Sequence, residues 1–349
     1  MEQQRAVTQS EIQCQSCGGQ CAFDPAQQDL LCKSCGSLWT LATEDDHKAA
    51  EEFPFNPDAP MAEPPILLGD QIHQCQTCGG EVIFTGPALS ESCPYCDGPV
   101  VLGIEDKAYA TMALVPFRID RDYATGRINE WVSGRVAAPN DLSAFAAEGR
   151  IASIYAPFWT FDSREAIEYW ASYTTGSGDN RRRHKVSGKM NVFFDDLLVP
   201  ASEHVTPLIR DGILHDFRPE YLRPYRAGYL AGFAAERHTM PVRKGLRLNA
   251  DDKDLLIRNK IKKRVGRKNT KVDSYRTDTT GIHYRRILLP VWILHYTYRG
   301  TAKKVVVSGI DGRTYGERPF SPWKLAGYSA LLTALIMAVG LVWGATGIL

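Results

Sequence analysis

Eight of the nine cysteines form four C-x2-C pairs, a spacing typical of protein metal sites. The eight fall into two sets with the same pattern, C-x2-C-x14-C-x2-C: Cys14, Cys17, Cys32 and Cys35, then Cys75, Cys78, Cys93 and Cys96. A two-residue gap lets a tight turn aim both thiolates of a pair at one ion, and two pairs complete the tetrahedral site that zinc prefers. The sequence therefore predicts two structural zinc ions, because four thiolates leave no coordination position for a catalytic water.

Other cysteine chemistry shares parts of this pattern. A rubredoxin-type iron centre also uses paired cysteine turns, so iron stays open as the metal. A thioredoxin-like redox site needs one C-x-x-C at the start of a helix, and four pairs in two matching sets do not fit it. His73 lies two residues before Cys75, but a complete four-cysteine set needs no further ligand. The ninth cysteine, Cys21, aligns with Val82, which predicts a buried apolar position.

Short hairpins must bring the cysteine pairs together. The two sets form an internal repeat offset by 61 residues, which also matches Gly18 with Gly79, Gly19 with Gly80 and Phe23 with Phe84. Each module has about 25 residues, too few to bury a core, so zinc binding on the order of 10–16 kcal/mol would supply its folding energy. We expect a zinc ribbon at residues 1–42, an acidic Pro-rich linker at 43–70 and a second ribbon at 71–107.

The charge of the chain is unevenly distributed. The 349 residues carry 41 Lys and Arg against 40 Asp and Glu, a net charge of +1, and their average composition excludes wholesale disorder. Residues 1–110 hold four basic and seventeen acidic side chains, a net charge of −13, which leaves +14 for the rest. Such asymmetry indicates different partners for the two parts. The acidic ribbons, made more negative by zinc-thiolate centres, would repel phosphate backbones.

The 25 residues from 325 to 349 contain no charged side chain. At about 1.5 Å per residue, a helix of this length covers a hydrocarbon core of roughly 30 Å. Arg313, Arg318 and Lys324 precede it, so the positive-inside rule predicts a cytoplasmic N-terminal part. The first ten residues lack the apolar stretch of a signal peptide. We therefore expect a tail-anchored, single-pass protein of the bacterial cytoplasmic (inner) membrane, with residues 323–349 as its transmembrane helix.

That helix also contains a G-x-x-x-G pair, Gly340 and Gly344, so the sequence allows a homo-oligomer formed through it. Between the second ribbon and the helix, residues 108–322 mix strand and helix patterns, which predicts a membrane-proximal α+β domain. Strands are expected at 111–117, 151–161, 166–174, 190–199, 287–298 and 303–310, and helices at 121–132 and 251–265.

Basic side chains concentrate twice in this domain. One cluster spans residues 181–185, and the other loads the polar face and end of the second predicted helix: Arg258, Lys260, Lys262, Lys263, Arg264, Arg267 and Lys268. A basic amphipathic helix near a cytoplasmic leaflet is well placed to bind anionic lipid headgroups, at about 1 kcal/mol per residue. Nucleic acid is the other acidic partner, and a solvated helix face is the plainer interpretation.

Enzyme motifs are absent from the sequence. It contains no G-x-x-x-x-G-K-[ST], G-x-G-x-x-G, H-E-x-x-H or G-x-S-x-G, and its eight histidines are scattered. Adjacent carboxylates such as Asp195 and Asp196 would point to opposite faces of a strand. We therefore predict that the protein is not an enzyme.

Several stretches resemble a known family. Besides the cysteines they are Val115–Phe117, Ile154–Asp162, Leu289–Trp292 and Gly309–Gly316. Together they resemble the bacterial membrane-anchored proteins with tandem zinc ribbons of the TFIIB type, which are often labelled as similar to the primosomal replication-restart helicase. This chain lacks the helicase's nucleotide-binding motifs. The resemblance implies a membrane adaptor acting near SPFH-type scaffold proteins.

Two functions from different classes follow. The first is a non-enzymatic, membrane-tethered adaptor that presents two acidic zinc modules to a protein partner at the cytoplasmic face. The alternative is a membrane-associated nucleic-acid-binding protein linked to replication restart or transcription, working through the basic clusters without helicase activity.

Overall fold

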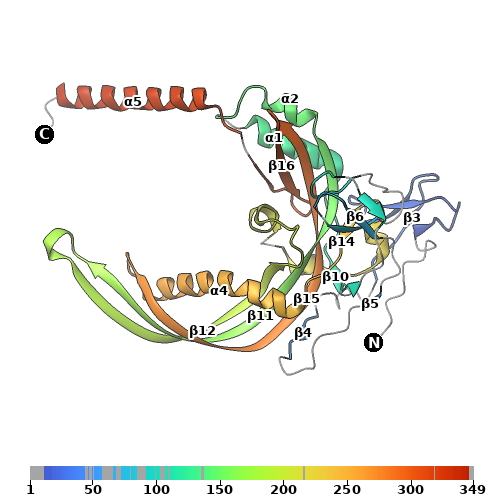
Figure 1. The fold of residues 1–349 in the computed structure, drawn as a ribbon. Coiled ribbons are helices and arrows are strands. Elements are labelled where there is room, and N and C mark those ends of the chain that lie inside the picture. The colour runs from blue at the N-terminus through green and yellow to red at the C-terminus, as the bar shows by residue number, and fades with distance from the viewer. Residues whose placement is uncertain are drawn as a thin grey trace.

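The computed structural model has a mixed fold of sheet and helices (Figure 1). It describes residues 12–43, 46, 49, 51–56, 66–67, 72–78, 80–84, 92–98, 100–102, 107–108, 111–134, 137–214, 217–317 and 319–345. The mixture of helices and strands agrees with the prediction from the sequence.

Three unusually long antiparallel strands form the frame of the molecule. They are β11 (Arg150–Thr175), β12 (Arg182–Pro200) and β15 (Lys271–Tyr298), with β11 in the middle. The predicted strands 151–161 and 166–174 are one continuous strand, because a register shift at Asp162 lets pairing resume beyond it. Pairing of β11 with β15 also brings together two Pro-x-Trp segments, 157–159 and 290–292, since Pro157 lies opposite Leu288 and Tyr155 lies opposite Pro290.

The outer halves of these strands project as an arm, defined here as residues 163–196 and 242–283 (Figure 1). Helix α4 (Val242–Val265) lies along it, and its Ile257 and Ile261 pack against Ile167, Tyr169 and Val272 of the strands. This helix begins nine residues before the predicted Asp251, and Gly266 in the left-handed region (φ 66°) ends it.

The inner halves of the strands belong to the body, defined as residues 111–162, 197–241 and 284–317. Its sheet has the order β13-β10-β15-β11-β14-β7-β6-β8, and β12, β16, β17 and β4 pair alongside. The further strands are β4 (Phe53–Pro54), β10 (Ala113–Leu114), β13 (Arg223–Pro224), β14 (Ala234–Glu236), β16 (Thr301–Ser308) and β17 (Thr314–Gly316), and β5 (Ile66–Leu67) pairs with β9 (Lys107–Ala108). Helices α1 (Arg121–Ser133), α2 (Leu142–Ala147) and α3 (Pro207–Ile209) accompany them, and α1 confirms the helix predicted at 121–132.

The ribbons join the body differently. Ribbon 1 is a separate three-stranded sheet of β1 (Cys21–Asp24), β2 (Asp29–Cys32) and β3 (Leu38–Trp39). Ribbon 2 contributes β6 (Ile72–Cys75), β7 (Glu81–Phe84) and β8 (Val100–Leu102) to the body sheet, because β7 pairs with β14. The domain boundary expected at residue 107 therefore does not separate ribbon 2 from the body, because the strands of both belong to one sheet.

The two cysteine sets pack into different hydrophobic clusters. Leu114 and Leu288 share a cluster with ribbon 1, whereas Ala113 and Ile287 share one with ribbon 2. Because successive strand residues point to opposite faces, the two clusters lie on opposite faces of the body sheet.

Helix α5 (Pro322–Ala345) extends from the body without packing against it (Figure 1). Its segment Pro322–Leu341 is long and apolar enough to cross a membrane and is 0% buried.

Candidate functional site

Both cysteine sets converge as the sequence predicts. In each set the four sulfur atoms lie within 4.8 Å of one another. Across ribbon 1 the Sγ atoms of Cys14 and Cys35 are 3.6 Å apart, and those of Cys17 and Cys32 are 3.5 Å apart. In ribbon 2 the corresponding separations are 3.4 Å and 3.7 Å.

These separations fit a tetrahedral metal ion. Four thiolates at the usual zinc–sulfur distance of about 2.3 Å stand about 3.8 Å from each other. The eight cysteines are free thiols, so no disulfide competes for the sulfur atoms. Backbone amides also point at them, including Gly19 N at 3.4 Å from Cys17 Sγ and Gly98 N at 3.4 Å from Cys96 Sγ. Such N–H groups stabilise thiolate charge, so both sets suit zinc, which would crosslink each pair of turns.

The turns that carry the thiolates require unusual backbone. Gly18 and Gly36 adopt positive φ values of 72° and 74° in ribbon 1. In ribbon 2, Asp97 occupies the position of Gly36 at φ 62°. Aspartate tolerates this region better than most residues, and Asp97 also accepts a hydrogen bond from Ser92 at 2.8 Å.

Ribbon 1 is held to the body by apolar contacts and by hydrogen bonds, including one from Gln28 Nε2 to Phe117 O at 2.8 Å. Phe23 packs edge-to-face on Tyr229 at 5.4 Å and on Phe233 at 6.4 Å between ring centroids. Its backbone N–H donates to Ala231 O at 2.9 Å. Cys21 is 1% exposed within the same cluster, as expected for an apolar position. Cys17 and Cys35 remain exposed, so this metal centre borders solvent.

Ribbon 2 is held by a buried polar network that the sequence analysis missed. Tyr95, between two ligand cysteines, donates to Glu236, which is 3% exposed. Glu236 also accepts from Ser202 and from Nδ1 of His204. The Nε2 atom of His204 reaches the carbonyl oxygen of Cys78 at 2.9 Å.

The charge state of this network follows from its contacts. The hydrogen bond to Glu236 raises the pKa of His204 to about 9, so both ring nitrogens donate at neutral pH. Burial raises the pKa of Tyr95 well above its ordinary value. No ring nitrogen of His204 is left to act as a base toward Ser202, so these residues do not form a nucleophile–base pair. The sequence feature that could have indicated this network is Tyr95, the aromatic residue inside the second C-x2-C pair of ribbon 2.

A third group of possible metal ligands lies at the base of the arm. Glu52, Asp162 and Asp195 approach within 4.8 Å, next to Arg285, which is 2% exposed and pairs with Glu52 at 3.3 Å. Arg285 also pairs with Asp196. Desolvation and a hydrogen bond with Asp162 raise the pKa of Glu52 to about 7. The carboxylates outnumber the one buried arginine, and the group lies where the pairing of β11 shifts register at Asp162.

The fold brings the two basic clusters together at the end of the arm. The arm tip, defined as residues 171–190 and 258–273, holds 13 basic and two acidic side chains. The guanidinium of Arg267 lies 5.9 Å from the ring of Tyr173, which stacks on His184 at 5.0 Å. A groove of about 520 Å³ is lined by Lys189, Lys260, Lys263 and Arg264.

Few of these cations are neutralised. Arg258 pairs with Asp254 at 2.8 Å, Arg183 with Asp273 at 2.9 Å and Lys189 with Glu168 at 3.7 Å. Within the described part of the chain, the remaining predicted patch residues make no ion pair: Lys260, Lys262, Lys263, Arg264, Arg267 and Lys268. The patch is thus exposed and strongly positive.

Comparison with known proteins gives one similar chain of unassigned function. The protein is 24% identical to the uncharacterized protein YdjG of Bacillus subtilis (strain 168) over 357 residues, which cover 94% of this chain and 96% of that protein. No protein-family model and no solved structure matches it. The family resemblance, the partner and the absence of enzymatic activity therefore stay predictions.

Proposed function

We propose that this protein is a non-enzymatic, membrane-tethered zinc-ribbon adaptor whose basic arm binds anionic lipid headgroups. Helix α5 would cross the bilayer, the arm tip would contact the headgroups, and the body with its two ribbons would bind a protein partner in the cytoplasm. The family resemblance and the acidic charge of the ribbon part support the adaptor role.

The observation that carries the proposal is that two basic clusters meet at one arm tip in a chain that also has an apolar, exposed helix. Figure 1 shows the arm and α5 leaving the body toward the same side. Because α5 starts at the body, its insertion would hold the body and the arm tip close to the membrane surface. The net charge of the arm tip, +11 from 13 basic and two acidic residues, would attract anionic lipids at about 1 kcal/mol for each cation near the surface.

The test uses the zinc-loaded full chain in nanodiscs. Amide hydrogen exchange of residues 181–190 and 260–270 should be slower in discs containing phosphatidylglycerol than in discs of phosphatidylcholine alone. Neutralising the arm pair, Lys263→Gln with Arg264→Gln, should remove most of that difference. A matched control, Lys33→Gln with Arg121→Gln, deletes the same charge elsewhere and should leave it intact.

Nucleic acid is the competing outcome. Tight binding of the nanodisc-embedded protein to duplex DNA at about 150 mM salt, lost in the arm-pair variant, would overturn the lipid assignment. It would favour the membrane-associated nucleic-acid binder instead. Equal exchange in both lipid compositions would also contradict the proposal.

A further inference from the structure

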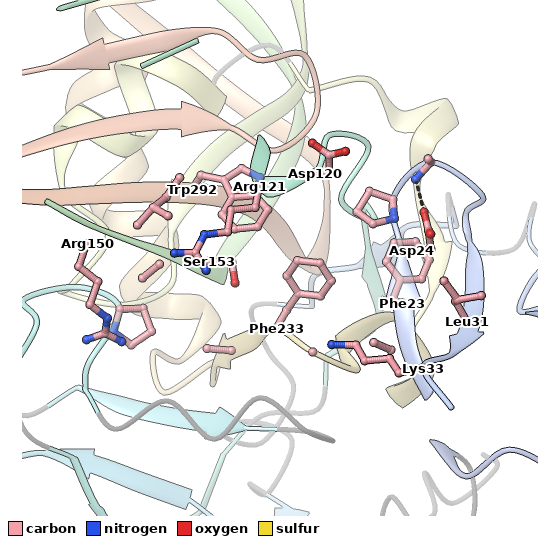
Figure 2. Close-up of a pocket in the computed structure, with 18 of the residues that line it drawn as sticks. Phe23, Asp24, Leu31, Lys33, Asp120, Arg121, Arg150, Ser153, Phe233 and Trp292 are labelled. Carbon is pink, nitrogen blue, oxygen red and sulfur yellow. Dashed lines mark hydrogen bonds between the residues drawn. The ribbon is translucent and has the colours of Figure 1, made fainter. Parts of the chain in front are cut away.

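Two hollows on the surface of the protein differ in charge. The cavity between the ribbons and the body, of about 1160 Å³ (Figure 2), is lined by equal numbers of acidic and basic side chains: Asp24, Asp97, Asp120, Lys33, Arg121 and Arg150. The groove on the arm, of about 520 Å³, is lined by four basic side chains and no acidic one: Lys189, Lys260, Lys263 and Arg264. The cavity therefore shows no preference for either charge, whereas the groove favours an anion.

The arm groove lies between α4 and the edge strand of the arm. Residues 189–193 of β12 form one side, and within the described structure β12 pairs only with β11. Lys260, Lys263 and Arg264 form the other side, because residues three and four apart lie on one face of a helix. The ammonium of Lys260 lies 5.6 Å from the ring centroid of Phe194 in β12. The two sides of the groove therefore belong to elements that pack on each other.

The positive charge of the groove is mostly uncompensated. Lys189 pairs with Glu168 at 3.7 Å, and both side chains are exposed, so water weakens their attraction. The other three cations make no ion pair within the part of the chain that the structure describes. One phosphodiester carries a single negative charge and would leave most of this positive charge unbalanced. Two linked phosphates match the groove better, because each could then pair with two basic side chains.

An exposed aromatic side chain adjoins these cations. Phe193 lines the groove and is 54% exposed. Its neighbours Val192 and Phe194 are buried in one cluster with Ile257 and Ile261 of α4, so Phe193 points to the opposite face of the arm sheet. An apolar side chain beside basic ones is typical of segments that lie on a membrane surface. A ligand with acyl chains next to its phosphates would cover this ring, which free phosphate would leave in water.

We propose that the arm groove binds the headgroup of a lipid with two linked phosphates, such as cardiolipin. The four basic side chains would pair with the phosphates, and Phe193 would contact the glycerol and the first acyl carbons. Basic pockets on the cytoplasmic side of membrane proteins bind headgroups of this kind. This inference rests on the proposed lipid contact of the arm and names the class of lipid that the arm selects.

The first test is a binding titration of the zinc-loaded full chain in detergent. The apparent Kd for cardiolipin should be about fivefold lower than that for phosphatidylglycerol at equal phosphate concentration, because the second phosphate adds ion pairs that are partly exposed. The arm pair, Lys263→Gln with Arg264→Gln, should abolish this preference. A matched variant, Arg181→Gln with Arg182→Gln, removes the same charge from the arm tip outside the groove. It should weaken the binding of both lipids alike and keep the preference.

Hydrogen exchange in nanodiscs locates the contact. With equal numbers of lipid phosphates, amides in residues 189–193 and 260–264 should exchange more slowly in cardiolipin discs than in phosphatidylglycerol discs. Unchanged exchange in residues 189–193, or equal loss of the cardiolipin preference in both variants, would overturn the proposal. Unchanged exchange of residues 167–171 verifies that the arm is folded in each variant.

Two competitors distinguish a lipid from other phosphate compounds. Deacylated cardiolipin, which keeps both phosphates but has no acyl chains, should compete more weakly than the intact lipid. Phe193→Ala should weaken binding of the intact lipid and leave binding of the deacylated headgroup unchanged. Equal affinity for both forms would assign the groove to a soluble phosphate compound instead. Displacement of cardiolipin by duplex DNA at equal phosphate concentration would assign it to nucleic acid.

Failure of this inference is distinguishable from failure of the proposed function. The general lipid contact is measured by the difference between phosphatidylglycerol and phosphatidylcholine, and the groove by the difference between cardiolipin and phosphatidylglycerol. Loss of the second difference alone would overturn the groove and leave a diffuse electrostatic contact. Loss of the first alone would overturn the general contact, while the groove would still select its lipid.

Discussion

The two ribbons share one cysteine pattern but depend on the body in different ways. Ribbon 1 keeps its own small sheet, leaves two ligand cysteines exposed and is attached through Phe23. Ribbon 2 is part of the body sheet and is attached through Tyr95 and Glu236. Ser34 of ribbon 1 is exposed where ribbon 2 has the buried Tyr95. The repeated residues specify the metal sites, whereas the residues between the ligands specify the docking.

The largest expected difference concerns loss of the metal. Cys78→Ser and Cys17→Ser should each reduce zinc from two ions to one, at a cost of up to about 10 kcal/mol for the affected site. Because β7 pairs with β14, Cys78→Ser should also raise hydrogen exchange in Ala234–Glu236 of the body. Cys17→Ser should confine the change to residues 12–39. Equal spread of exchange in both variants would remove the distinction between the ribbons.

The apolar attachment should be the next most costly to break. Phe23→Ala removes the ring that packs on Tyr229 and Phe233 and should destabilise the docked state of ribbon 1 by about 3–5 kcal/mol. The zinc content should stay at two, since Phe23 is not a ligand. Faster proteolysis of ribbon 1 at constant zinc content is the measurement. Release of zinc would show that docking and metal binding are coupled.

Removing one hydrogen bond from the polar attachment of ribbon 2 should cost less free energy than removing the Phe23 ring from ribbon 1. Tyr95→Phe removes one donor from the buried carboxylate of Glu236 and should lower the free energy of unfolding by about 1–3 kcal/mol. Chemical denaturation of the full chain in detergent measures this loss. Ser34→Ala, at the equivalent exposed position of ribbon 1, is the matched control and should change stability by less than about 0.5 kcal/mol.

The smallest effect concerns the segment between the ribbons. Glu52 faces Asp162, Asp195, Asp196 and Arg285, and its folded pKa of about 7 lies above the ordinary 4.5. The folded state therefore binds a proton more tightly than the unfolded state, so this group lowers stability as the pH rises from about 4.5 to 7. Glu52→Gln should flatten that slope and stabilise the protein at pH 8, on the order of 1 kcal/mol given partial exposure. Thermal unfolding at pH 5 and pH 8 checks this, and an unchanged slope would contradict it.

Local patterns were readable from the sequence and distant pairings were not. The cysteine spacing identifies both ligand sets because each turn is built from four neighbouring residues. Periodicity likewise predicts α1 and the C-terminal half of α4. It does not show that strands predicted separately form one 26-residue strand, because that depends on register with β15.

Long-range contacts explain the rest of the site. Tyr95 and Glu236 are 141 residues apart, and no local rule links a tyrosine to a carboxylate at that distance. The basic clusters at 181–185 and 258–268 were both visible in the sequence. Their meeting at one arm tip depends on the antiparallel return of β12 and on the packing of α4 along the arm.

The parallel course of α5 and the arm has a mechanical consequence (Figure 1). The outer part of β11, residues 163–175, spans about 43 Å, and the 24-residue α5 spans about 36 Å. An α5 that crosses a bilayer in this orientation would carry the arm's arginines into hydrocarbon, at about 2.5–3.5 kcal/mol each. Crossing therefore requires α5 to swing away from the arm about residues 319–321. Tethers between this joint and the body include Ser321 N to Ala137 O at 2.9 Å and Lys324 Nζ to Ala138 O at 2.7 Å. This joint would act as a pivot that sets how high the ribbons stand above the lipid surface.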